Sequence, residues 1–170
     1  MLRVADRPAT VRTPRRPLSA RLRRTVLTVH IATSVGLLGD VAAVLAMNVR
    51  AATTDDPQLA DATYQLLEMF SFLFGIPLSF IALGSGIVLG LGSKWGVLRY
   101  AWVTIKLGLL VSVILVGALV LGPATAAMQA GEGGRETVLI AGAAYDVLAL
   151  ALATGLSVFK PRFAASGTRP

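Results

Sequence analysis

Four ionisable side chains stand inside long apolar stretches of this sequence: His30, Asp40, Lys106 and Asp146. An Asp or Lys at membrane depth raises the free energy by about 2.5 to 3.5 kcal/mol on insertion scales, so it normally has a partner or a watery path. Two carboxylates at one level can share a proton and titrate as a pair. These residue types therefore predict an intramembrane polar site that binds a proton, a cation or a small polar solute.

The distances of these residues from flanking basic residues predict two layers. His30 and Lys106 each follow an arginine by six or seven residues, which places them about 9 to 11 Å along a helix from one boundary. Asp40 and Asp146 lie about 21 to 24 Å from the same boundary. A lysine stem is long enough to reach towards a neighbouring layer. We therefore expect Asp40, Asp146 and Lys106 to form one coupled polar site.

Small residues accompany both carboxylates at helical spacing. Asp40 shares a helix face with Ala32 and Gly36, and Asp146 follows Gly142 by one turn. Small residues let a neighbouring helix approach closely in a membrane. Both carboxylates are therefore predicted to face the interior of a helix bundle rather than lipid.

Other roles stay open for two of the four residues. Lys106 can extend its ammonium group to the lipid headgroups, and His30 can be a hydrogen-bonded packing residue. The sequence contains no cysteine and only one histidine, and it has no glycine-rich phosphate loop, nucleophile elbow or zinc motif. We therefore assign no catalytic residues and no metal site, and an enzyme is the less expected interpretation.

The elements that would position these residues are four apolar runs, at residues 25–47, 66–91, 101–121 and 138–159. Each has the length of about 20 residues that a helix needs to cross about 30 Å of hydrocarbon. Hydrophobic residues make up 55% of the chain and charged residues 15%, with a mean hydropathy of +0.71. The runs lack the alternation of barrel strands. The predicted fold is all-α, a polytopic membrane protein with a four-transmembrane-helix bundle.

Proline and glycine predict where these helices begin, bend and end. Asp56 and Pro57 form an N-cap followed by proline, so the second helix should start there, before its apolar run. Gly75 and Pro77 should interrupt that helix. The pair Gly122–Pro123 is expected to end the third helix.

Basic residues predict the orientation. Residues 1–24 hold eight of the 16 Lys and Arg residues and are expected to form a disordered cytoplasmic tail. Lys94 and Arg99 in the second loop, and the basic C-terminal tail 161–170, agree with the rule that basic segments stay in the cytoplasm. The membrane domain is thus residues 25–160, with both termini inside. Trp95, Tyr100 and Trp102 are expected in an interfacial aromatic belt.

The basic N-terminal tail also bears on partners and on processing of the chain. Attraction to anionic lipid headgroups accounts for its charge more simply than nucleic-acid binding, so the predicted partner is the lipid bilayer. The pair Arg23–Arg24 before an apolar run also resembles a cleaved twin-arginine signal. That run is long, contains His30 and Asp40, and precedes three further spans, so an uncleaved first helix is favoured.

Two sequence stretches resemble known membrane families: TVHIATSVGLLGD at residues 28–40 and RYAWVTIKLGLLV at residues 99–111. They are similar to the four-helix families around the protoporphyrinogen oxidase of the haem pathway and the copper-resistance membrane domain. This resemblance implies that His30 and Lys106, four residues after Trp102, bind a cofactor, a b-type haem. Over residues 20–160 the chain more closely resembles a bacterial family of predicted integral membrane proteins without assigned function, which implies a multi-pass protein of the bacterial plasma membrane.

Three functional hypotheses follow from these features. The first is a binding or transport protein that uses Asp40, Lys106 and Asp146 to hold a proton, cation or small solute. The second is an accessory subunit that packs through its glycine faces into a homo-oligomer or a larger membrane complex. The third is a haem-binding membrane oxidoreductase, because a single proximal histidine such as His30 can hold haem iron.

Overall fold

The computed structural model of the protein describes residues 19–92 and 101–159. Within these ranges the chain is helical and has no strand, and four of its helices are long and apolar enough to span a membrane. The predicted all-α fold with four membrane-spanning helices is confirmed. Lys94, Trp95, Arg99, Tyr100 and both predicted tails beyond residues 19 and 159 lie outside the described residues.

The first span is a single helix, α1 (Ala20–Ala52), of 33 residues. The Ser19 hydroxyl caps it by accepting a hydrogen bond from the Leu22 N–H at 3.3 Å. At 1.5 Å per residue α1 is about 50 Å long, well beyond the hydrocarbon thickness. The apolar run 25–47 marks only the part of α1 that hydropathy can detect, because the polar turns at either end are also helical.

The second span consists of α2 (Pro57–Phe70), the π-helical turn η1 (Ser71–Gly75) and α3 (Ile76–Leu91). The Asp56 carboxylate caps α2 by accepting hydrogen bonds from two backbone N–H groups, at 3.0 and 3.4 Å. The predicted start near Pro57 is therefore confirmed. The interruption before Pro77 is also present, but as a π-turn in which the Ile76 N–H bonds to the Ser71 carbonyl, so the span continues.

The third span has the same construction: α4 (Ala101–Val116), the π-turn η2 (Gly117–Leu121) and α5 (Gly122–Gln129). The Gly122 N–H bonds to the Gly117 carbonyl, and Pro123 occupies the first turn of α5. The prediction that Gly122–Pro123 ends this helix is wrong. The wider π-turn accommodates Pro123, which has no N–H to donate. The helix therefore continues for two more turns as α5.

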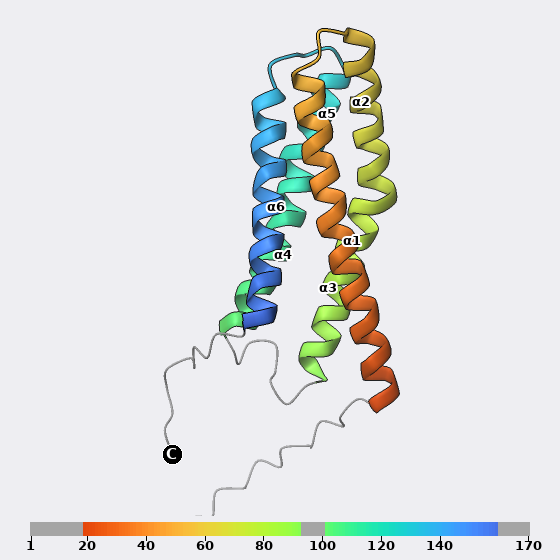
Figure 1. The fold of residues 1–170 in the computed structure, drawn as a ribbon, viewed down its shortest axis with the longest axis vertical. Coiled ribbons are helices and arrows are strands. Elements are labelled where there is room, and N and C mark those ends of the chain that lie inside the picture. Colours follow the sequence, from red (N-terminus) through yellow and green to blue (C-terminus); the bar gives the residue numbers. More distant parts are fainter. Residues whose placement is uncertain (1–18, 93–100, 160–170) are drawn as a thin grey trace, which may run out of the picture.

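The fourth span is α6 (Glu136–Phe159), and it closes an antiparallel bundle. As Figure 1 shows, α1 packs against both α3 and α6, and α4 packs against α6. The connections at residues 53–56 and 130–135 lie at the same end of the bundle, which we call the loop end. We call the opposite end, where α1 begins and α6 ends, the terminus end.

The buried apolar residues form two separate clusters. The loop-end cluster consists of Ala51, Tyr64, Leu67, Ala124 and Leu139. The mid-bundle cluster consists of Leu37, Val41, Val113, Ala149 and Leu150. Most other large apolar side chains on the described helices are exposed, as expected where lipid rather than water surrounds the bundle.

Candidate functional site

Polar residues lie between the two apolar clusters. On α1, Asn48 falls between the positions that the two clusters occupy, and on α6 Asp146 does the same. Each is only 3% exposed. The interior of the bundle therefore has polar residues between its two apolar clusters. Asp40 lies beside the mid-bundle cluster, between Leu37 and Val41 on α1. We call Asp40, Asn48 and Asp146 the polar layer.

Residue pairs that share a cluster set the register between α1 and α6: Ala51 with Leu139, and Val41 with Ala149. In this antiparallel register Asp146 lies level with Val44. It is therefore about one helical turn, or about 6 Å along the axis, from both Asn48 and Asp40. Asp40 and Asn48, eight residues apart on α1, are therefore separated by about 12 Å along the axis, and Asp146 lies between them in depth.

The polar layer contains acceptors that lack donors. Oδ1 of Asp40, Oδ1 of Asn48 and Oδ1 of Asp146 are all buried and have no hydrogen-bond partner among the described residues. The Nδ2 of Asn48 donates a hydrogen bond to the Val44 carbonyl at 3.0 Å, and its Oδ1 remains without a donor. Buried polar atoms are nearly always paired in folded proteins, so these three unpaired acceptors require a physical explanation.

Asp40 lies against the π-turn η1, and the turn of α6 before Asp146 lies against η2. A Cβ added to Gly75, the last residue of η1, would lie 3.2 Å from Oδ2 of Asp40. A Cβ on Gly142, one turn before Asp146, would lie 2.7 Å from Cδ2 of Leu121, the last residue of η2. The small residues noted in the sequence thus allow these close approaches. Short π-helical turns inside α-helices occur frequently at functional sites.

The structure does not bring Lys106 to either carboxylate. Its Nζ lies 5.9 Å from the centroid of the Trp102 ring, a cation–π distance. Lys106 lies in the second turn of α4 and His30 in the first half of α1, so both are nearer the terminus end than either carboxylate. Across residues 19–92 and 101–159, no ion pair joins Lys106 to Asp40 or Asp146.

His30, by contrast, has its hydrogen bonds supplied by α3. Its Nδ1 lies 3.1 Å from the Ala82 carbonyl oxygen and 3.0 Å from Oγ of Ser85. Because a carbonyl oxygen only accepts, Nδ1 carries the proton. A Cβ on Gly86 would lie 3.1 Å from Cε1 of His30, so the absence of a side chain there makes room for the ring.

The family resemblance implied a haem at His30. The bonds to α3 engage Nδ1 and leave Nε2 with no hydrogen bond among the described residues, and the ring edge packs on Gly86. The cavity of about 500 Å³ lies at the loop end and has neither His30 nor Lys106 in its lining. This arrangement fits a histidine that joins two helices, and we derive no haem chemistry from it.

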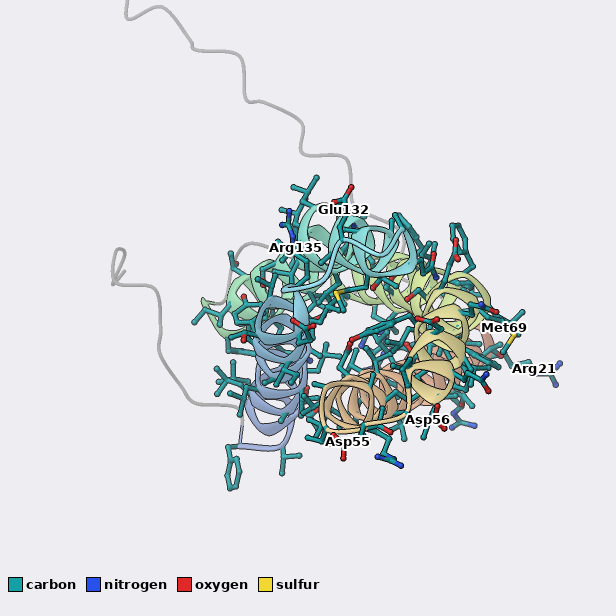
Figure 2. All side chains as sticks on the ribbon, turned by 90° about the horizontal axis from the view of Figure 1, so that it is seen from above. Arg21, Asp55, Asp56, Met69, Glu132 and Arg135 are labelled. Atoms are coloured by element: carbon teal, nitrogen blue, oxygen red, sulfur yellow. The ribbon has the colours of Figure 1, made fainter. Side chains whose placement is uncertain are left out.

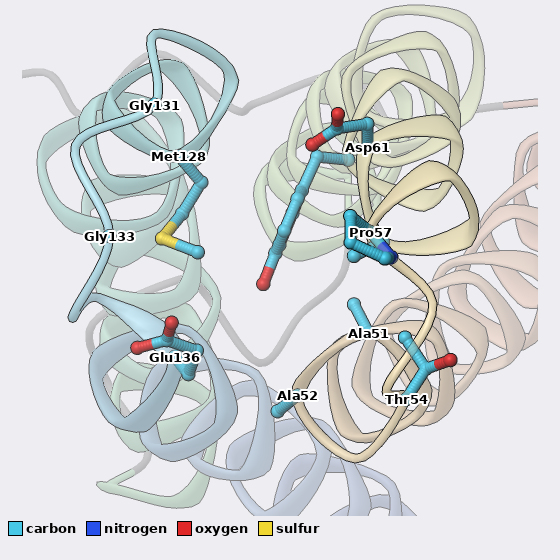
Figure 3. A pocket seen from close by; sticks show the side chains of 11 residues that line it. Ala51, Ala52, Thr54, Pro57, Asp61, Met128, Gly131, Gly133 and Glu136 are labelled. Atoms are coloured by element: carbon cyan, nitrogen blue, oxygen red, sulfur yellow. The ribbon is translucent and has the colours of Figure 1, made fainter.

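That cavity contains functional candidates that the sequence pattern missed. Asp61 and Tyr64 of α2, Met128 of α5 and Glu136 of α6 line it, as the close view in Figure 3 shows for the labelled residues. Figure 2 looks onto the loop end, where Asp55, Asp56, Glu132 and Arg135 are labelled. The available signal was Asp61 one turn before Tyr64, which by itself looks like an ordinary helix start.

Taken together, these features define a class: a polytopic helical membrane protein with a polar layer inside its bundle. No curated protein and no solved structure matches the sequence. A family model does match, over residues 24–161, and its description is "Predicted integral membrane protein (DUF2269)". The chain belongs to this family. The match confirms the expected membrane family.

Proposed function

We propose that this protein binds a proton or a small cation at the polar layer, in a bacterial plasma membrane, and that the ion enters from the loop end. The observation that carries the proposal is Asp146, a carboxylate that is 3% exposed and whose Oδ1 has no donor among the described residues. A charged carboxylate buried without a partner is strongly unfavourable. A bound proton or cation supplies the missing partner.

The neighbours of Asp146 favour a positive ligand over a negative or neutral one. Asp40 and Asn48 also present unpaired buried oxygen atoms, each about one helical turn from the depth of Asp146. A group of acceptors without donors attracts ions that are positive or that carry hydrogen-bond donors, and it repels anions. Among the described residues no group of three or more His, Cys, Asp or Glu side chains suits a metal ion. A proton or a monovalent cation therefore suits this layer best.

The charge of the two ends supports entry from the loop end. Carboxylates predominate there, at Asp55, Asp56, Asp61, Glu132 and Glu136, against Arg50 and Arg135. Acidic surfaces raise the local concentration of cations. The first turns of α1, at the terminus end, carry arginines instead. By the positive-inside rule, we place the loop end outside the cytoplasm.

Infrared difference spectroscopy tests the binding of the proton or cation. Full-length protein in lipid nanodiscs should show a protonated-carboxyl band that decreases when the pH is raised or when sodium replaces choline. The Asp146→Asn variant should lose this band. Asp55→Asn, which removes an exposed carboxylate at the loop end, should keep it. A spectrum of Asp146→Asn identical to that of the wild type in every buffer contradicts the proposal.

Reporter fusions test the orientation. A periplasm-active reporter after Pro170 should give no signal, whereas insertion at Gly133 in the loop before α6 should give a strong one. The physical reason is the excess of basic residues at the terminus end. The reverse pattern of signals would place the acidic end in the cytoplasm and remove the proposed entry route.

A further inference from the structure

A second candidate site lies at the loop end, apart from the polar layer. It is the cavity of about 500 Å³, within the range of about 300 to 1,000 Å³ that small-molecule sites occupy. Two carboxylates line it, Asp61 from α2 and Glu136 from α6, and its lining contains no Lys or Arg. Figure 3 shows these two acids on different helices across the space, with Met128 of α5 on the same side as Glu136.

Tyr64 points to a ligand independently of the acids. It is 4% exposed and belongs to the lining of the cavity, yet no described residue forms a hydrogen bond with its hydroxyl group. Both Glu136 and Asp61 are close enough to act electrostatically on it. The ring is buried, but the hydroxyl oxygen is not one of the fully buried unpaired atoms, so it opens onto the cavity, where a ligand can reach it.

The two acids differ in how far the protein uses them. Oε1 of Glu136 accepts a hydrogen bond from the Gly134 N–H at 3.3 Å, which orients the side chain at the start of α6. Asp61 has no such bond among the described residues. The wall that carries Asp61 and Tyr64 is fixed by Gln129, whose Nε2 donates to the Tyr64 carbonyl oxygen at 3.0 Å. The pocket is thus held in shape while its carboxylates remain available.

We propose that this pocket binds a small linear diamine. One ammonium group pairs with Asp61 and the other with Glu136, in charge-assisted hydrogen bonds. An ammonium has three N–H donors, so one of them also reaches the Tyr64 oxygen. Ala51, Ala60 and the flexible thioether of Met128 line the remaining wall and contact the methylene chain. No residue of the polar layer takes part.

A divalent metal ion is the competing ligand for two carboxylates. Calcium takes six to eight oxygen ligands, and magnesium requires near-ideal octahedral geometry. The described residues contain no group of three or more metal-type side chains here or elsewhere. The apolar wall and the phenol also suit an organic cation better than a bare ion.

Calorimetric titration of the full-length protein in nanodiscs tests the proposal, with putrescine as the probe. Putrescine should bind saturably, whereas butanediol, which has the same chain without charge, should not. Asp61→Asn and Glu136→Gln should each weaken binding about tenfold or more, because each removes a charge-assisted bond. Tyr64→Phe keeps the ring packing and should weaken binding about threefold or more.

The matched control is Glu132→Gln, which removes the same charge from an exposed position in the neighbouring loop. It should leave the affinity for putrescine unchanged. An equal loss in Glu132→Gln would show diffuse attraction to an acidic surface and overturn the site. Tighter binding of calcium than of putrescine would overturn the diamine. Asp146→Asn should bind putrescine normally. The diamine site can therefore fail its test while the proposed function of the polar layer stands, and the polar layer can fail while the diamine site stands.

Discussion

Two ionisable groups inside this bundle, the half-buried His30 and the buried Asp146, have opposite surroundings. His30 has an acceptor and a hydroxyl group from α3 at hydrogen-bond distance, and a glycine makes room for its ring. Asp146 is more deeply buried and has an oxygen without any described donor. Both looked alike in the sequence, as single polar residues in apolar helices. The difference teaches that the supply of hydrogen-bond partners, rather than depth alone, separates a packing group from a binding group.

The largest expected effect is on the His30 side of this comparison. His30→Ala should lower the free energy of unfolding by about 3 kcal/mol, because it removes the bonds to α3 and leaves a cavity beside Gly86. His30→Asn keeps a donor near the position of Nδ1 and should recover part of the loss. Thermal unfolding in detergent measures both variants. Equal stability of wild type and His30→Ala would show that the α1–α3 bonds contribute nothing.

Replacing Asp146 with an apolar residue should change the free energy of unfolding in the opposite direction, towards greater stability. Asp146→Leu replaces an unpaired carboxylate with an apolar group and should raise the free energy of unfolding by about 1 to 2 kcal/mol. The variant should also lose the infrared signal of the carboxyl group. The same unfolding measurement checks the prediction. A destabilised Asp146→Leu would mean that the carboxylate has a structural partner, and the contrast with His30 would disappear.

The smallest expected effect concerns Lys106. Lys106→Met removes the contact with Trp102 and should lower the unfolding free energy by about 0.5 to 1 kcal/mol. Because no ion pair joins Lys106 to Asp146 among the described residues, the double variant with Asp146→Asn should be additive within about 0.5 kcal/mol. A larger interaction energy would support the coupled site expected from the sequence. The double-mutant cycle needs only the four unfolding curves.

The predictability of this fold followed from the length and polarity of its segments. Four apolar runs and the Asp56 cap were enough to locate the spans, because a bilayer imposes helix length and helix ends need partners. The wrong prediction at Pro123 came from treating a glycine–proline pair as a terminator. A local pattern does not reveal that a π-turn will carry the helix past a proline.

The candidate site was less predictable than the fold. Spacing from the basic residues grouped His30 with Lys106 in one layer, and that grouping stays a prediction. The lack of contact between Lys106 and the carboxylates depends on how α4 rotates in the bundle, which periodicity does not fix. The loop-end cavity requires the ends of four helices to meet, so Asp61 and Glu136 could not be paired from the sequence.

The π-turn η1 also changes which residues of the second span share a face of the helix. A π-turn adds one residue to a helix, which rotates everything after it by about 100°. In an uninterrupted α-helix, Ser79 would lie about 120° around the axis from Leu67. With the extra residue the two lie within about 20° of one another, and both are buried. One inserted residue thus lets a single long span keep a continuous buried face from the loop end to the α3 contacts with His30.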